Sequence, residues 1–477
     1  MAQANSIPVR NPRTGAVDFD LTPATAADVA ATAARLRAGQ KAWGAASVEH
    51  RIGVLNQWAE AIRERRQDII DADSEDTGYG QISRIAPDMM LGALFGNARA
   101  APGAFEAAKR QGRSPNMPNV AYDSVLKPIP LIGVISPWNA PTMLSMLRSI
   151  PPLFAGCAVL LKPSEVTPRF TRPLMDSVRA VPELAAVFDV VLGAGETGQA
   201  VVDNVDLINF CGSVANGRRV AEACARRLIP SELELGGKDP LVVTATADLD
   251  KAVTAAVRGA LTSTGQVCFS IERIYVHESV HDEFVRRLVA KAEQAELNYP
   301  DPMKGQLSPF ISDRQPAIVA DHLADAVSKG AKVLTGGEVL ALGGGLYMRP
   351  TVVVDVTHEM TLMKDETFGP VMPVMRYRTA DEAVALANDT AFGLSAAVMA
   401  GTEEEARAIG ERINAGNVSL QDCFLTFAAA AVESDSFGAS GLGGRRSGIQ
   451  RYLKRQGLLI NTAEPACLID DGLKAAE

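Results

Sequence analysis

Short strand-like runs and helix-like segments alternate along most of this chain, and this alternation restricts its fold more than any other feature. Between residues 157 and 227 the strand-like runs are CAVLLKP, VFDVVLG and DLINFCG, and the helix-like segments after them are 168–180, 197–203 and 216–227. A second series starts at LVVT after residue 240 and ends with a helix-like segment closed by Gly416. Such alternation is typical of parallel sheets covered by helices on both faces. The sequence therefore predicts two doubly wound α/β lobes.

The segments outside these series follow other patterns. Helices are predicted over residues 25–37, which begin with the Thr25/Asp28 capping pattern, and over the amphipathic stretch 47–67. The proline-containing run 120–134 is interpreted as one extended strand, and the tail from Gly457 as a strand with a frayed end.

Composition excludes several classes of protein. The 47 basic and 56 acidic residues give a net charge of −9 without a long run of either sign, so the basic surface required by nucleic acid or an anionic membrane is missing. The longest uncharged stretch, residues 128–147, contains four prolines and is therefore not expected to be a membrane helix. Six scattered cysteines, with an N-terminus that lacks the apolar core of a secretory signal, predict a cytoplasmic protein in a reducing compartment.

Cys268 is the strongest candidate for a reactive side chain. It lies in TSTGQVCFS, just after a predicted helix and next to glycine and polar residues, whereas Cys157 and Cys211 lie in apolar strand patterns and Cys224 in a helix. An ordinary thiol, with a pKa of about 8.5, is only a few per cent ionised at neutral pH, so a nucleophilic cysteine needs backbone donors or a cation nearby.

Glu234 and Asn139 are candidates to assist such a thiol. Glu234 lies between two leucines in LELGGKDP, where a carboxylate is either satisfied by backbone amides or desolvated and ready to act as a base. Alone, the structural alternative is favoured, but a nearby cysteine nucleophile would favour catalysis because a thioester needs activated water. Asn139, in SPWNAPTM, is interpreted as a turn residue or as a donor to an oxyanion.

Two glycine loops compete for the phosphates of a nucleotide. GAGETG at residues 193–198 has the spacing of a dinucleotide fingerprint but lacks the acidic residue expected about 20 residues later. GSVANG at residues 212–217 also opens a helix and offers Ser213 and backbone amides. Lys162 and Glu165, in LLKPSE, are suited to ribose hydroxyls, and a carboxylate there favours NAD over NADP because it repels a 2′-phosphate.

The remaining motif, HESVH at residues 277–281, matches the spacing of a zinc-protease site. His277 ends a strand pattern and Ser279 is expected to cap the next helix, so the two rings should diverge, and no metal site is predicted. His50, His322 and His358 are expected at the surface.

With these motifs combined, the sequence resembles the aldehyde dehydrogenase superfamily over essentially its whole length. The matching motifs are SPWNAP, LKPSE, FCGS with GSVANG, LELGGKDP, GQVC and ETFGPV, in the family's order. The resemblance implies that Cys268 is the nucleophile, Glu234 the general base and Asn139 the oxyanion donor. It implies an NAD cofactor, with NADP possible as an alternative, whose contacts are Trp138, Lys162, Ser164, Glu165, Gly212, Ser213, Gly217, Leu235, Gly236, Glu366 and Phe368. It also implies that GSVANG, and not the more fingerprint-like GAGETG, lies near the pyrophosphate.

The resemblance further implies a domain organisation and an assembly. Residues 1–115 and 136–236 are expected to form the NAD-binding domain and residues 237–440 the catalytic domain. Residues 116–135 and 455–477 are expected to form an oligomerisation arm, which predicts a homodimer or homotetramer.

Departures from the family pattern concern the substrate. Ala140 stands where many members place an aromatic ring, Ser263 replaces a usual asparagine, FTGS becomes FCGS, and SFGASGLGGRRSG replaces the usual glycine-lysine motif. The predicted substrate pocket, which is apolar and wide, consists of Ala140, Leu144, Leu147, Val267, Phe269 and Phe427. This pocket predicts an aromatic or medium-chain aldehyde as the substrate. The alternative substrate is a semialdehyde such as succinate semialdehyde, for which Arg148 is the one candidate partner of the carboxylate. A CoA-acylating reaction is a further alternative, which the presence of Glu234 disfavours.

Overall fold

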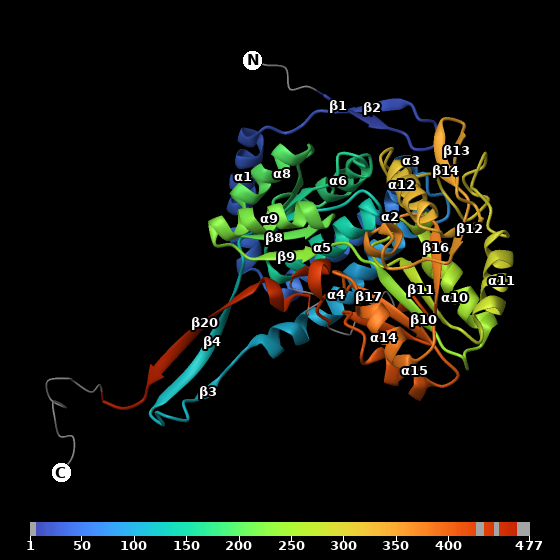
Figure 1. The fold of residues 1–477 in the computed structure, drawn as a ribbon. Helices are drawn as coiled ribbons and strands as arrows, with labels where there is room; N and C mark the ends of the chain where they lie inside the picture. The colour runs from blue at the N-terminus through green and yellow to red at the C-terminus, as the bar shows by residue number, and fades with distance from the viewer. Residues whose placement is uncertain (1–5, 426–433, 443–447, 465–477) are drawn as a thin grey trace, which may run out of the picture.

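Two large sheets, each flanked by helices, form the body of the molecule, and a narrow arm projects from it (Figure 1). The computed structural model describes residues 6–425, 434–442 and 448–464. The predicted fold class, with two doubly wound α/β lobes and a small β arm, is confirmed.

The first large sheet has six strands. They are β5 (Leu131–Ile135), β6 (Ala158–Lys162), β7 (Phe188–Val190), β8 (Leu207–Cys211), β9 (Ser231–Glu234) and β19 (Gly441–Leu442). Their order across the sheet is β19-β9-β8-β5-β6-β7, and all neighbours are parallel except β19, which pairs antiparallel with β9. The helices of this part are α1 (Ala26–Ala45), α2 (Val48–Glu64), α3 (Arg66–Thr77), α4 (Ala86–Ala108), α5 (Pro141–Ala155), α6 (Thr171–Arg179), α7 (Pro182–Ala185), α8 (Gly195–Asn204) and α9 (Val214–Arg227).

Local capping and tertiary packing together set the length of α1. The Thr25 hydroxyl accepts from the Asp28 amide and the Asp28 carboxylate accepts from the Thr25 amide at 2.9 Å, so the predicted capping box is confirmed. The helix runs eight residues beyond the predicted end at residue 37. The buried Trp43 explains the extension, because its indole N–H donates to the Leu153 carbonyl of α5 at 3.0 Å.

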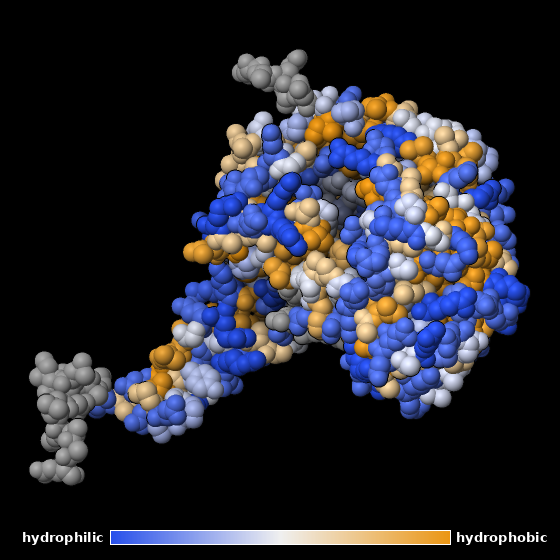
Figure 2. Space-filling view, viewed as in Figure 1, coloured by the Kyte–Doolittle hydropathy of each residue, from blue (hydrophilic) through white to orange (hydrophobic). Residues whose placement is uncertain are grey.

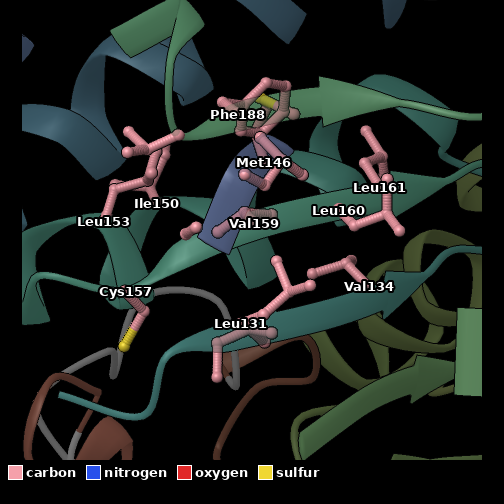
Figure 3. Close-up of a cluster of buried hydrophobic side chains, with 14 of the residues drawn as sticks. Leu131, Val134, Met146, Ile150, Leu153, Cys157, Val159, Leu160, Leu161 and Phe188 are labelled. Carbon is pink, nitrogen blue, oxygen red and sulfur yellow. The ribbon is translucent and has the colours of Figure 1, made fainter. Parts of the chain in front are cut away.

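Side chains between β5, β6, β7 and the covering helix α5 form the core beneath the first sheet (Figure 3). Leu131, Val159 and Phe188 come from the three strands, and Ile150 and Leu153 come from α5. All five are fully buried, which explains why these strands read as continuous apolar runs in the sequence.

The second large sheet has seven strands. They are β10 (Asp239–Val243), β11 (Ile271–His277), β12 (Lys332–Thr335), β15 (Thr351–Val354), β16 (Val371–Tyr377), β17 (Ser395–Met399) and β18 (Asn417–Leu420). Their order is β12-β15-β16-β11-β10-β17-β18, with only β12 antiparallel to its neighbour. The helices of this part are α10 (Leu249–Leu261), α11 (His281–Ala292), α12 (Gln315–Ser328), α13 (Thr361–Lys364), α14 (Ala380–Asn388) and α15 (Glu403–Gly410).

Helices cover both faces of this second sheet. Along β10, Leu241 and Val243 belong to one apolar cluster and Val242 belongs to another. Because successive side chains of a strand point to opposite faces, the sheet has a core on each side. This is the doubly wound arrangement that the alternating pattern predicted.

The arm is a three-stranded sheet of β3 (Gly112–Arg113), β4 (Val120–Pro128) and β20 (Leu453–Asn461), and it extends away from both lobes (Figure 1). Leu459 and Ile460 are 78% and 50% exposed, and apolar residues are visible on its surface in Figure 2. The prediction of one strand over residues 120–134 is wrong. The chain ends β4 at Pro128 and enters the six-stranded sheet as β5, because residues 131–135 are all buried there, so the arm is shorter than expected at this end.

Two small hairpins complete the fold: β1 (Ile7–Arg10) with β2 (Val17–Leu21), and β13 (Val339–Leu342) with β14 (Gly345–Met348). Among the described residues, no helix combines the length and apolar character needed to cross a bilayer.

Candidate active site

Many of the predicted site residues line one cavity of about 260 Å³. Its walls consist of Pro137, Trp138, Asn139, Leu144, Cys211, Gly212, Ser213, Leu235, Gly236, Cys268, Gln315, Ile318, Glu366 and Phe368. Several of these residues directly follow the carboxyl ends of β5, β8 and β9, which are three consecutive strands of the six-stranded sheet. The cavity thus lies where parallel sheets ordinarily bind ligands, and Figure 2 shows the surface hollowed between the two lobes.

The segment before Cys268 is a turn, η2 (Thr262–Gly265), in a strained conformation. Ser263 and Thr264 have φ values of 54° and 59°, in the left-handed region that such residues rarely adopt. Buried hydrogen bonds hold the turn: the Tyr79 hydroxyl donates to the Ser263 carbonyl at 3.2 Å, and the hydroxyls of Thr264 and Ser308 lie 2.9 Å apart. Strain of this kind is typical of functional sites.

Asn139 is tied to the Cys268 segment. Its side-chain nitrogen donates to the backbone carbonyl of Gln266 at 2.9 Å, and Asn139 is buried. The Gln266 side chain is also buried and accepts from the Ile311 amide at 3.0 Å. The structure therefore brings Asn139 to the loop of the candidate nucleophile, as the oxyanion hypothesis requires.

Cys268 differs from the other cysteines of the described residues, because Cys157, Cys211, Cys224 and Cys423 are buried and Cys268 is partly accessible. Desolvation raises the pKa of the Cys268 thiol well above its ordinary value, and Cys211, Glu366 and Glu234 add to the effect. The thiol is therefore protonated at neutral pH and needs a base or a bound cation to react.

Glu234 ends β9 and forms an ion pair with Arg148 of α5, whose Nη2 lies 3.0 Å from the Glu234 Oε1. Both side chains are largely buried. Burial is the largest single influence on the pKa of Arg148 and lowers it, but Glu234, Cys211 and Tyr452 together outweigh burial and raise the value. The Arg148 cation is thus directed at the candidate base.

Comparison with known proteins identifies the family to which this site belongs. The aldehyde dehydrogenase family model matches residues 1–456. The chain belongs to the aldehyde dehydrogenase family. It is 36% identical to the putative succinate-semialdehyde dehydrogenase [NADP(+)] of Mycolicibacterium smegmatis, over 94% of this chain and 88% of that protein.

Solved structures agree with this membership. The putative aldehyde dehydrogenase PutA from Anabaena variabilis superposes with a TM-score of 0.94 at 45% identity, covering 97% of this chain and 99% of that one. Betaine aldehyde dehydrogenase from Staphylococcus aureus, solved with NAD⁺, superposes with a TM-score of 0.91 at 27% identity, covering 98% and 93%. The chain is therefore an NAD(P)-dependent aldehyde dehydrogenase.

The dinucleotide side of this aldehyde dehydrogenase site contains a suitable set of donors. Gly212 and Ser213 line the cavity, and the Ser213 hydroxyl caps α9, whose N-terminus is suited to a pyrophosphate. Gly217 packs closely against the neighbouring loop, since a Cβ there would lie 2.4 Å from the Leu235 side chain. The competing loop at residues 193–198 does not contribute to the cavity lining.

Lys162 and Glu165 lie beyond the cavity lining, at the end of β6. The Lys162 Nζ is 3.1 Å from the Glu165 Oε2; the lysine is buried and the glutamate is partly exposed. Ser164, between them, accepts from the Val166 amide at 3.2 Å and is buried. A cation and a carboxylate side by side fit the hydroxyls of a ribose.

Glu366 and Phe368 form the opposite wall. The Phe368 ring packs edge-on against Trp138 with centroids 5.4 Å apart. The Glu366 Oε1 accepts from the Gly237 amide at 3.0 Å, and burial together with the Glu272 charge raises the pKa of Glu366 to about 8. The loop at 236–237 packs tightly, since a Cβ on Gly237 would lie 2.2 Å from the Cys268 carbonyl oxygen.

The structure does not place all predicted substrate residues in the cavity. Leu144 lines it, but Leu147, on the same helix, is 38% exposed. Ala140 precedes α5 and Val267 precedes Cys268, and neither contributes to the lining. Phe269 is buried and packs edge-on against Phe424 at 4.8 Å, whereas Phe427 lies outside the described residues.

Sequence reasoning missed several contributors. Gln315 and Ile318 line the cavity from α12, and no motif marks them. Cys211, interpreted from the sequence as a packing residue, is indeed buried but also lines the cavity. Arg148, the only charged residue of α5, was expected as the one candidate partner of a substrate carboxylate, and its contact with Glu234 was not expected.

The histidines of the sequence motifs lie away from this cavity. His277 ends β11 and His281 begins α11, and the cap is Val280, one residue later than expected. Among the described residues, no group of three His, Cys, Asp or Glu side chains could hold a metal. The expectation that His322 is solvated is wrong: it is buried, and its Nδ1 lies 3.2 Å from the Thr367 hydroxyl.

Proposed function

We propose that this chain oxidises an aldehyde to a carboxylic acid with NAD, using Cys268 as nucleophile, Glu234 as general base and Asn139 as oxyanion donor. The observation that carries the proposal is the cavity at the carboxyl ends of β5, β8 and β9, which Cys268 and Asn139 share with Glu366 and Phe368. A partly accessible thiol and a dinucleotide wall in one cavity suit a covalent oxidation.

In the proposed reaction, the Cys268 sulfur attacks the aldehyde carbon, and the side-chain amide of Asn139 donates to the oxygen that becomes negative. Bound NAD supplies a hydride acceptor for the resulting thiohemiacetal. Glu234 then takes a proton from water, which attacks the thioester and releases the acid. Because burial keeps the Cys268 thiol protonated, the thiol must first release its proton to solvent.

The ion pair with Arg148 gives Glu234 a defined position for accepting a proton from water. A carboxylate held by a single cation at 3.0 Å keeps its second oxygen available, and Oε2 is the oxygen that we assign to water. Because Glu234 activates water, we expect the thioester to be hydrolysed, so that the product is a free acid and not acyl-CoA.

For the substrate we propose an aromatic or medium-chain aldehyde. Leu144 and Ile318 give the cavity an apolar wall. Arg148, the sequence candidate for holding a substrate carboxylate, is engaged by Glu234. The similarity to the Mycolicibacterium smegmatis protein, whose name specifies succinate semialdehyde, favours a semialdehyde as the second candidate.

The arm supports a further proposal, that the enzyme is a homodimer or homotetramer. Leu458, Leu459 and Ile460 on β20 are exposed, and a contiguous apolar edge of this kind suits contact with a second copy.

The test is covalent trapping. The enzyme is incubated with an aldehyde and NAD, quenched in acid and digested, and the acyl group should be found by mass spectrometry on Cys268; Cys268→Ala should form no adduct and no NADH while still binding NAD. Adduct formation on another residue, or NADH production by Cys268→Ala, would refute the assignment. Initial rates with aromatic, aliphatic and carboxylated aldehydes then decide between the two substrate classes.

A further inference from the structure

Glu272 is a buried carboxylate four residues after Cys268, and the proposed reaction gives it no role. It lies in β11 and is 3% exposed. Its side chain points at the segment that carries Glu366 and Phe368, where its two oxygens meet backbone amides.

Both oxygens of the Glu272 carboxylate accept hydrogen bonds from the backbone, and we call this pair of bonds the clamp. The Glu272 Oε2 accepts from the Thr367 amide at 2.7 Å, and its Oε1 accepts from the Phe368 amide at 2.8 Å. These two amides belong to the peptide units on either side of Thr367, so the carboxylate fixes the backbone directly after Glu366 and directly before Phe368. Two consecutive amides directed at one anion form a strong, oriented contact.

The clamped segment needs such support. Phe368 has a φ of 53°, in the left-handed region that is costly for a residue with a side chain. The segment lies between α13 and β16 and has no regular secondary structure to hold it. External hydrogen bonds must therefore stabilise its conformation.

Lys238 links the clamp to the loop that follows Glu234. Its Nζ is 2.6 Å from the Glu272 Oε2 and 3.0 Å from the Thr367 hydroxyl, and its side chain is fully buried. The neighbouring Gly237 amide donates to Glu366 at 3.0 Å. The loop after the proposed base and the proposed cofactor wall are thus joined at two points.

We propose that Glu272 is a positioning residue that, together with Lys238, orients Glu366 and Phe368 toward the bound dinucleotide. The inference rests on the proposed function. Buried ion pairs are by themselves weak contributors to stability. The pair of Lys238 and Glu272 differs because Glu272 also accepts from the amides of Thr367 and Phe368, which set the backbone direction next to the cofactor contacts Glu366 and Phe368.

The test compares three variants of the full-length enzyme with the wild type. Glu272→Gln keeps the shape but can accept from only one amide with its oxygen. The double variant Lys238→Met with Glu272→Met removes the clamp without leaving an unpaired buried charge, so it covers the case in which Glu272→Gln fails to fold. Asp76→Asn is the matched control, because Asp76 is also fully buried and accepts from the Arg169 amide and guanidinium, both at 2.6 Å, away from the cavity.

Three quantities are measured: NADH affinity by calorimetry, hydrolysis of p-nitrophenyl acetate without cofactor, and the midpoint of thermal unfolding. Both clamp variants should bind NADH more weakly by about tenfold or more, the loss expected for charge-assisted hydrogen bonds. Their ester hydrolysis should stay within about twofold of wild type, since it needs Cys268 and Glu234 but no dinucleotide. Asp76→Asn should lower the unfolding midpoint and leave NADH affinity unchanged.

Two results would overturn the inference: unchanged NADH affinity in the double variant, or ester hydrolysis that falls by the same factor as NADH affinity. A wild-type enzyme that oxidised no aldehyde would refute the proposed function instead. The NADH affinities would still decide the role of Glu272 in that case, because they require no turnover.

Discussion

Replacing Glu234 with glutamine should separate formation of the acyl-enzyme from its hydrolysis. The side chain is buried and its Oε1 lies 3.0 Å from the Arg148 Nη2. Glutamine has the same length, and its amide oxygen can still accept from Arg148, so the local geometry should persist. The variant loses the basic oxygen that activates water, and positioned general bases accelerate such steps by about 100- to 10,000-fold.

The cost to folding should be smaller than the cost to hydrolysis. The variant replaces a charge-assisted contact to Arg148 with an ordinary hydrogen bond, a loss of about 1 kcal/mol in the free energy of unfolding. A urea titration of both proteins measures this loss and shows that the variant is folded during the kinetic assay.

The assay is rapid mixing with saturating aldehyde and NAD. Glu234→Gln should give a burst of NADH stoichiometric with active sites and then a steady rate reduced by about 100-fold or more. Arg148→Met is a second variant for the same assay, because it keeps the Glu234 carboxylate but removes the cation that positions it. Steady turnover equal to wild type in Glu234→Gln would refute the reasoning, as would a folded variant whose burst and steady rate fell equally.

Three further outcomes are expected. Glu165→Ala should lower the KM for NADP by about fivefold through loss of a charge repulsion, with little change for NAD, and comparing the two cofactors checks this; a wild type that already prefers NADP would contradict it. Because burial raises the pKa of Glu366 to about 8 from 4.5, the cofactor-free native state holds a proton that the unfolded chain releases, so stability should fall as pH rises between these values, by up to about 1.4 kcal/mol per pH unit. Urea titrations across that range should show a shallower decline for Glu366→Gln, and equal slopes would speak against it. Ile460→Asp in the arm should shift the oligomer toward monomer in analytical ultracentrifugation, whereas Val327→Asp, at an exposed position of α12 outside the arm, should not; an unchanged assembly in Ile460→Asp would exclude this edge from the interface.

Local sequence was enough to predict most individual elements. Two examples are the capping box of Thr25 and Asp28 and the buried apolar runs at β6 and β8. Each depends on residues that are neighbours in the chain, so its pattern can be recognised in the sequence alone. Prediction failed where tertiary packing decided. The break after Pro128 reflects the completion of a sheet by β5, and the buried position of His322 reflects its contact with Thr367, 45 residues away.

The candidate site shows the same division. Cys268, Glu234 and Asn139 stood out because each residue type occupies a chemically unusual context, and the family resemblance assigned their roles. The sequence by itself determined the alternation of strands and helices, hence two parallel sheets whose loops gather at their carboxyl ends. Only the tertiary structure paired Arg148 with Glu234 and brought Glu272 to the amides of Thr367 and Phe368, because these partners are 86 and about 95 residues apart and ion pairs and hydrogen bonds act over a few ångströms.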